Sequence, residues 1–174
     1  MKTIIAVMVL TASALAQGPS VRVASACGPK NVSFDVKLDD SRHTAALPEP
    51  GRAMVYFIQD DGPWGKYQHY VLKIGVDGEW VGAYKKNSYF TVDLMPGDHH
   101  VCAAVQSTYP LRNYLALAHF TAEPGKTYYF HTQFFNGTSS LYPSPPYVQL
   151  DLLDSDEGKY MISIYPLSVW SAKK

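Results

Sequence analysis

The sequence predicts an all-β fold, an antiparallel β-sandwich of about eight strands with a short C-terminal helix. Short segments of alternating apolar and polar residues recur along the chain, and no long helical pattern lies between them. A Pro-Gly turn precedes three of these segments, at residues 49–52, 95–98 and 123–126. Proline fixes φ at the first central position of such a turn, and glycine supplies a positive φ at the second. Strands at this short spacing are typical of sandwiches.

The predicted strands comprise residues 53–58, 70–76, 79–84, 89–94, 99–106, 115–122, 127–135 and 147–153. The second and third of them form the clearest hairpin, because Asp77 and Gly78 between them both tolerate the positive φ of a tight turn. A shorter alternating segment at residues 32–36 is a further candidate to pair with the main sheet.

Only the C-terminal region has a helical pattern. The acidic stretch at residues 154–157 offers a cap and first-turn carboxylates that suit the helix dipole. Tyr160, Met161 and Ile164 follow as a short apolar stripe, which stops before Pro166. We expect this helix to pack across an edge or an end of the sheet.

The bulk composition indicates one domain with a sizeable core. The chain has 174 residues, 47% of them hydrophobic, and its 15 Lys and Arg balance 15 Asp and Glu. A neutral chain lacks the basic surface that nucleic-acid binding needs. After the N-terminal apolar run, no stretch approaches the ~20 apolar residues of a transmembrane helix. We divide the chain into a signal peptide (1–16), an N-terminal segment (17–48) and a β-sandwich domain (49–174).

The first residues have the features of a secretory signal peptide. Lys2 gives a basic start, residues 4–10 form a short apolar run, and Ala14-Leu15-Ala16 matches a cleavage site. We therefore expect an exported protein, located in the periplasm or outside the cell.

The cysteines of the mature chain, Cys27 and Cys102, predict one disulfide in an oxidising compartment. Strand alternation places Val101, Ala103 and Val105 on the core face, so Cys102 points to the opposite face. The bond would clamp the N-terminal segment, tethered in this way, against the outside of the sheet. Closing a loop of this length contributes roughly 4 kcal/mol of stability.

Lipidation of Cys27 is the alternative interpretation. The triplet Ala24-Ser25-Ala26 directly before Cys27 has the look of a lipoprotein cleavage site. Arg22 separates the triplet from the apolar run, and Ala24 stands where a larger aliphatic residue is usual. Lipidation would also leave Cys102 as an odd thiol outside the cell.

Residues 73–82, 87–90 and 96–103 together resemble the bacterial domain-of-unknown-function family 2846, especially its exported members from soil bacteria. The likeness covers about residues 52–133 and consists mainly of turns and core strands. It implies an immunoglobulin- or transthyretin-like sandwich in the cell envelope, and no catalytic residue. The start at Ala26-Cys27-Gly28-Pro29 is similar to exported members and supports pairing of Cys27 with Cys102.

No motif in the sequence predicts catalysis, a cofactor or a metal centre. A G-x-S-x-G nucleophile elbow and a phosphate-binding glycine loop are both missing. His99 and His100 are adjacent on a strand and therefore point to opposite faces, where they cannot easily bind one ion. His119 and His131 lie on other strands, and no spacing demands that they meet.

The aromatic residues near two long loops are candidate ligand contacts. Trp64, Tyr67, Tyr142 and Tyr147 lie in or beside loops 60–67 and 136–146, where they would form a stacking platform. Tyrosine is also an ordinary strand residue, so a purely structural role is the competing interpretation. The leading hypothesis is a non-catalytic module that binds a protein or cell-surface partner through its sheet edges and end loops. The alternative is a carbohydrate-binding module that uses the loop aromatics.

The two interpretations of Cys27 predict different masses for the mature protein. We expect an intact mass that rises by two hydrogen atoms on reduction, because a disulfide joins Cys27 to Cys102. A mass that includes a lipid attached to Cys27 would contradict the disulfide and support lipoprotein anchoring.

Overall fold

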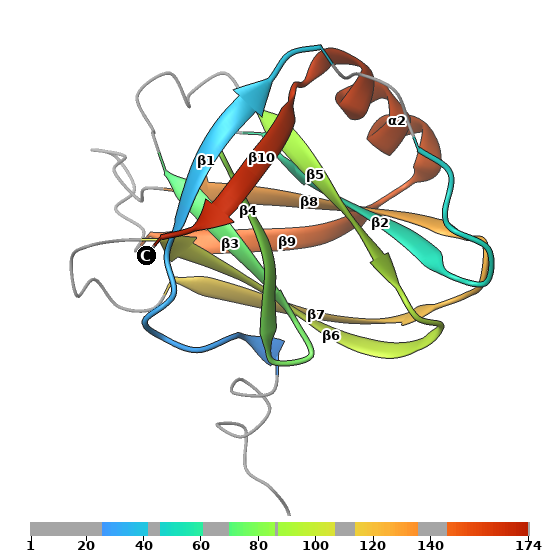
Figure 1. Ribbon diagram of the computed structural model, residues 1–174, viewed down its shortest axis with the longest axis horizontal. Helices are drawn as coiled ribbons and strands as arrows, with labels where there is room; N and C mark the ends of the chain where they lie inside the picture. The colour runs from blue at the N-terminus through green and yellow to red at the C-terminus, as the bar shows by residue number, and fades with distance from the viewer. Residues whose placement is uncertain are drawn as a thin grey trace, which may run out of the picture.

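The computed structural model describes residues 26–41, 46–60, 70–85, 87–106, 114–135 and 146–173, which form two stacked β-sheets and a helix (Figure 1). The six-stranded sheet has the order β1 (Phe34–Asp39), β10 (Leu167–Ala172), β5 (Ser88–Leu94), β2 (Ala53–Gln59), β8 (Thr127–Phe135) and β9 (Tyr147–Leu153). The four-stranded sheet has the order β4 (Glu79–Lys85), β3 (Val71–Val76), β6 (Gly97–Gln106) and β7 (Leu115–Ala122). The fold is therefore mostly β, a sandwich-like arrangement of two sheets, as the sequence predicts. The larger sheet is not purely antiparallel as expected, because β2 pairs in parallel with β8 and β10 pairs in parallel with β5. These pairings join strands that are distant in the sequence, which local alternation does not reveal.

All eight predicted strands are present, with bounds that agree to within two residues. The turn between β3 and β4 is the predicted one, with φ of 51° at Asp77 and 93° at Gly78. The described residues contain ten strands because β1 and β10 pair with each other at the margin of the larger sheet. β1 corresponds to the short alternating segment near residues 32–36. β10 was not predicted because most of its residues are exposed and show no apolar alternation.

The main core lies between the two sheets. Phe57 of β2 stacks on Phe90 and Phe130, with ring centroids 5.4 and 5.6 Å apart. Leu72 and Ile74 of β3 are fully buried in the same core from the opposite sheet. Each packed aromatic ring of this kind buries a large apolar surface.

A second, smaller core lies on the other face of the larger sheet, under helix α2 (Ser155–Ile164). Tyr56 stacks on Tyr129 at 5.2 Å between centroids, and Ile58 and Ile162 are buried beside them. β2 is consequently buried on both faces. This explains why its sequence is a continuous apolar run rather than an alternating one.

Helix α2 begins as predicted, with the Asp154 carboxylate accepting hydrogen bonds from the backbone N–H groups of Asp156 and Glu157 at 2.8 and 3.0 Å. It does not pack across an edge or an end of the sheet as expected, but on the outer face of the interior strands β2 and β8, where their apolar side chains need cover. Its buried face was predicted wrongly in part, because Tyr160 and Ile164 of the expected stripe are 65% and 47% exposed.

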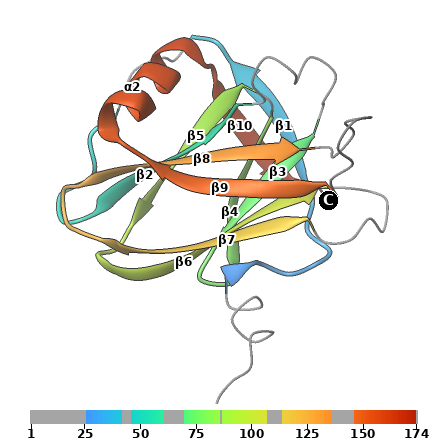
Figure 2. The same cartoon turned by 180° about the vertical axis from the view of Figure 1, so that it is seen from behind.

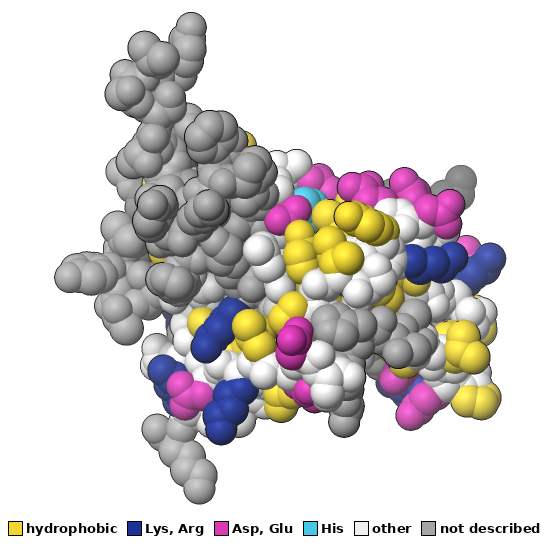
Figure 3. Space-filling model, turned by 90° about the horizontal axis from the view of Figure 1, so that it is seen from above, with side chains coloured by type: hydrophobic (Ala, Val, Ile, Leu, Met, Phe, Trp, Pro, Cys, Tyr) yellow, Lys and Arg dark blue, Asp and Glu magenta, His cyan; other side chains and the backbone are white. Residues whose placement is uncertain are grey.

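Gly158 explains why the helix turns a different face toward the sheet from the one predicted. A Cβ at this position would lie 2.2 Å from Tyr129 Cγ, so glycine is what permits the helix to approach the sheet here. The helix therefore turns Gly158 and Ile162 toward the sheet. From above, hydrophobic side chains lie together beside a row of acidic ones (Figure 3).

The two sheets approach each other along two sides. β7 lies beside β9 on one side, and β4 lies beside β5 and β10 on the other (Figure 2). Backbone pairing between the sheets does not occur within the described residues. β7 is thus an edge strand of the smaller sheet, and β9 is an edge strand of the larger one.

The close approach at Gly158 predicts an inverted effect of Gly158→Ala. In an exposed helix this change stabilises by about 1 kcal/mol through helix propensity. Here we expect it to destabilise by about 1–3 kcal/mol, because the new methyl group collides with the ring base and Cβ of Tyr129. Urea unfolding measures the effect, with Lys159→Ala on the exposed face as the control. A rise in stability for Gly158→Ala would contradict the packing described here.

Candidate functional site

The disulfide predicted from the sequence is present and lies on the outer face of the four-stranded sheet. Cys27 and Cys102 are bonded with their Cα atoms 5.1 Å apart, across a sequence separation of 75 residues. Val101 and Ala103 on either side of Cys102 enter the main core, so the prediction from strand alternation is confirmed. Cys102 is itself fully buried, because the N-terminal segment covers it.

We call residues 26–34, which lie against this outer face, the strap. The strap comes so close to β3 that Gly75 has no space for a side chain. A Cβ there would lie 2.7 Å from the Ala26 carbonyl oxygen and 3.1 Å from Cys27 Cα. Gly28 has no space for a side chain either, because a Cβ there would lie 2.4 Å from Cδ1 of Trp80 in β4. Glycine is therefore required on both sides of this contact.

Lys73 fixes the middle of the strap. Its side chain projects from the outer face of β3, is only 7% exposed, and donates a hydrogen bond from Nζ to the Val32 carbonyl at 2.8 Å. The ammonium lies 4.2 Å from the centre of the Trp80 ring, a cation–π distance. Trp80 Nε1 in turn donates to the Pro29 carbonyl at 2.8 Å. Burial lowers the pKa of Lys73, and the strap supplies the polar contacts that its charge requires.

Gln106 fixes the far end of the strap. Its side-chain amide accepts a hydrogen bond from the Phe34 backbone N–H at 2.7 Å and donates one to the Phe34 carbonyl at 2.9 Å. The amide thereby imitates a neighbouring strand where β1 begins. The strap connects the smaller sheet to the larger one, in which β1 is an edge strand.

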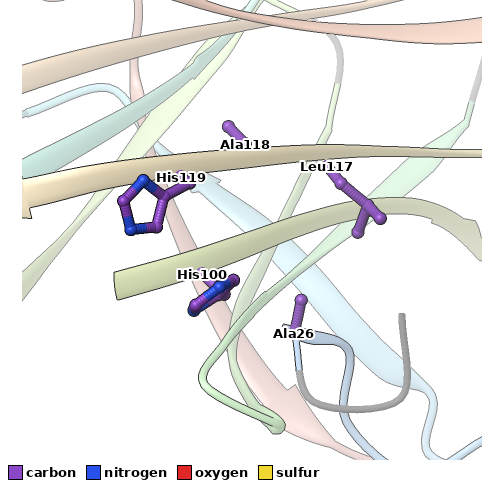
Figure 4. Close-up of a pocket in the computed structure, with 5 residues that line it drawn as sticks. All are labelled: Ala26, His100, Leu117, Ala118 and His119. Atoms are coloured by element: carbon purple, nitrogen blue, oxygen red, sulfur yellow. The ribbon is translucent and has the colours of Figure 1, made fainter. Parts of the chain in front are cut away.

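Beyond the strap, the outer face of β6 and β7 carries a shallow hollow. Figure 4 shows its lining, which consists of Ala26, His100, Leu117, Ala118 and His119. His100 and His119 lie directly opposite each other on the two strands, and their ring centroids are 5.0 Å apart. Both side chains are exposed, and Leu117 is 43% exposed.

The backbone of His100 explains this close approach. Its N–H donates to Asp77 Oδ1 at 2.9 Å, and its carbonyl accepts from the Asp77 N–H at 3.0 Å. Both groups therefore point toward the β3–β4 turn and away from β7. His100 and His119 form a non-hydrogen-bonded antiparallel pair, the kind with the shorter Cα separation of about 4.5 Å and the closer side chains.

His99 points the other way, and its surroundings favour the protonated ring. Its Nδ1 is 2.6 Å from Asp77 Oδ2 and its Nε2 is 2.7 Å from the Met95 carbonyl oxygen. Both partners are acceptors, so the ring satisfies them best when both nitrogens carry hydrogen. Burial opposes the charge, but the hydrogen bonds to Met95 and Asp77 outweigh it and raise the pKa of His99. Likewise burial opposes ionisation of Asp77, but the His100 and His99 contacts lower its pKa.

β7 leaves half of its backbone groups directed away from the sheet. Phe120, Ala118 and Ala116 lie opposite the β6 residues whose N–H and carbonyl groups face β7. By alternation, the backbone groups of Leu117 and His119 point outward. Within the described residues β7 pairs with β6 alone. The strand reads LALAHFTA and contains no acidic or basic residue other than His119 and no proline.

Most of the predicted aromatic platform lies outside the described residues. Trp64, Tyr67 and Tyr142 belong to that undescribed part. Tyr147 is the first residue of β9, is 44% exposed, and stacks on Phe135 of β8 with centroids 4.6 Å apart and planes 17° apart. The structure therefore describes one aromatic stack near this loop and does not show the four residues together.

Within the described residues, no group of three or more His, Cys, Asp or Glu side chains is arranged to hold a metal ion. No described helix has the length and apolar character of a membrane span. No protein-family model matches the chain, and no curated protein matches it. The site is therefore interpreted from its own geometry.

Two features of this face were not found by sequence reasoning. The pairing of His100 with His119 depends on the β6–β7 register, in which Gly97 lies opposite Ala122, and no local pattern states that register. The burial of Lys73 was also missed, because a lysine on an alternating strand normally marks the solvent face. The absence of charge in β7 was visible in the sequence.

The His99–Asp77 pair predicts a pH-dependent contribution to stability. The pKa of His99 is raised above 6.5. Protonated His99 therefore contributes fully to the unfolding free energy below pH 6.5, and this contribution is lost as pH rises through the higher pKa of the folded state. The pKa of Asp77 is lowered below 3.8, so its contribution is lost only as pH falls through that lower value. We expect the difference in unfolding free energy between wild type and His99→Gln to be larger at pH 5.5 than at pH 8.5.

Asp77→Asn provides the matched background for this measurement. Without the carboxylate, His99→Gln should lose its pH-dependent effect, because the imidazolium no longer has its anionic partner. A difference between wild type and His99→Gln that grows with rising pH would show that the charged pair does not form.

Proposed function

We propose that this protein is an exported, non-catalytic β-sandwich module that binds a protein partner at the cell surface or in the envelope. The immunoglobulin- or transthyretin-like topology and membership of domain-of-unknown-function family 2846 are part of this proposal. The disulfide supports it, because such bonds persist in oxidising compartments outside the cytosol. The signal peptide at residues 1–16 is consistent with the same location.

The observation that carries the proposal is the uncharged edge strand β7, which within the described residues pairs with β6 alone, although β9 of the other sheet lies beside it. Natural edge strands are usually shortened, charged, interrupted by proline or covered, because free backbone groups recruit other strands. β7 is eight residues long and has neither lysine, aspartate, glutamate nor proline. Its outward backbone groups at Leu117 and His119 are therefore suited to an extended segment of a partner.

The surroundings of β7 suit recognition as well as pairing. Leu117 presents an exposed apolar side chain on the outer face, next to the hollow lined by Ala26 and Ala118. In strand addition, main-chain hydrogen bonds supply affinity and pockets for alternate side chains supply specificity. A partner segment along β7 would place an apolar side chain against Leu117 and into this hollow. Among the described residues, the strap covers only the neighbouring part of this face.

A carbohydrate-binding module is the second candidate function. The observation that favours it is the stack of Tyr147 on Phe135, because a half-exposed aromatic ring held in place by a second ring is a platform for a sugar. Trp64, Tyr67 and Tyr142, the other aromatic residues predicted for this platform, lie outside the described residues. The two candidates use different faces, so they are separable by substitution.

The β7 proposal predicts a local effect of Leu117→Lys. We expect a photoreactive residue at position 117, introduced in cells that export the protein, to form a discrete crosslink to one partner. The purified partner should bind wild type and should bind Leu117→Lys at least tenfold more weakly, because charge on an edge strand opposes strand addition. Equal affinity for the two would contradict the proposal.

Ile164→Lys is the matched control, because Ile164 is 47% exposed and lies on α2, away from β7. It should leave partner affinity unchanged. Loss of binding with Ile164→Lys and not with Leu117→Lys would place the interface on the helix instead.

A glycan array tests the carbohydrate alternative. If that alternative is right, wild type binds cell-wall or plant glycans, and Tyr147→Ala or Trp64→Ala weakens the binding while Leu117→Lys does not. The leading proposal predicts no wild-type signal across the array.

A further inference from the structure

We propose that His100 and His119 form a two-histidine binding site for a divalent transition-metal ion of the class that prefers imidazole, such as Zn²⁺, Ni²⁺ or Cu²⁺. The two rings lie on adjacent strands, face the same exposed hollow and are directly opposite in register (Figure 4). Neutral imidazole nitrogen is a preferred ligand of these ions. The inference does not depend on a protein partner.

The separation of the rings suits chelation. A bound ion lies about 2.0–2.1 Å from each imidazole nitrogen, which puts it about 3.2 Å from each ring centre. For angles between roughly 90° and 110° at a tetrahedral or square-planar ion, the two ring centres are then about 4.5–5.2 Å apart. The observed separation of 5.0 Å between the centroids of His100 and His119 lies within this range.

The backbone beneath the two ligands is already fixed. Asp77 holds the N–H and carbonyl groups of His100, and Cys102, two residues further on the same face of β6, is bonded to Cys27. His119 is held opposite by the pairing of β6 with β7. Ion binding therefore requires ordering of two exposed side chains and little movement of the main chain, which reduces its entropic cost.

The composition of the hollow defines what kind of site this is. Within the described residues no third His, Cys, Asp or Glu is positioned to complete the coordination. The remaining lining, Ala26, Leu117 and Ala118, is apolar. An ion held by two protein nitrogens keeps its other positions for water or for an external donor, as open metal sites do. Ca²⁺ and Mg²⁺ prefer oxygen ligands and are not expected to bind.

The test is titration of the untagged, disulfide-intact full protein with Zn²⁺ and Ni²⁺, followed by calorimetry and by the NMR signals of the histidine rings. Chelation gains affinity because the second ligand binds intramolecularly, so loss of either ring should weaken binding by roughly a hundredfold. We expect His100→Gln and His119→Gln to be similarly defective and the double variant to bind no more tightly than either, with a stoichiometry near one ion in wild type.

His43→Gln and His69→Gln serve as controls, because they remove the same chemical group from other parts of the chain and should leave the affinity unchanged. His100 and His119 are both exposed, so their glutamine variants should unfold at the wild-type urea concentration. The proposal is overturned if wild type binds no better than the double variant, or if either single variant retains wild-type affinity.

Discussion

The contact on which the rest of the structure depends is the closure of the strap over the outer face of the four-stranded sheet. Gly75 allows the main chain of the strap to touch β3, and the Cys27–Cys102 bond fixes it there. Lys73 then has a carbonyl and an aromatic ring for its buried charge. The strap leads directly into β1. The contact between the strap and the smaller sheet therefore covers the outer face of that sheet and also anchors the edge strand of the larger one.

The same closure divides the outer face into two parts with different properties. Over β3 and β4 the face is covered, its polar groups are paired, and glycine replaces side chains where the strap passes. Over β6 and β7 the described residues leave the face uncovered, with an exposed leucine, two opposed histidines and an edge strand without fixed charge. The proposed partner-binding edge and the proposed two-histidine metal site both lie on this second part. The covered part holds β6 in position for them, through Asp77 on one side of His100 and Cys102 on the other.

The features predicted correctly are those that depend on neighbouring residues in the sequence, namely strand positions, side-chain direction and turn type. Alternation identified eight strands and the outward direction of Cys102, and turn chemistry identified Asp77-Gly78. β10 was missed because its residues are mostly exposed, and the buried face of α2 was misjudged because Gly158 packs on a distant Tyr129. The His100–His119 pair depends on cross-strand register, which is a tertiary property. Of the aromatic residues predicted as a platform, Tyr147 alone lies in the described part of the chain.

The central claim is that the strap is part of the folded domain and that the disulfide holds it in place. The most direct test compares the unfolding free energy of wild type with that of Cys27→Ser/Cys102→Ser, measured with urea and accompanied by hydrogen exchange of the strap amides. The account predicts a loss of about 4 kcal/mol, with faster exchange in the strap than in β6. A loss below about 1 kcal/mol, with unchanged protection of the strap, would show that the disulfide does not stabilise it.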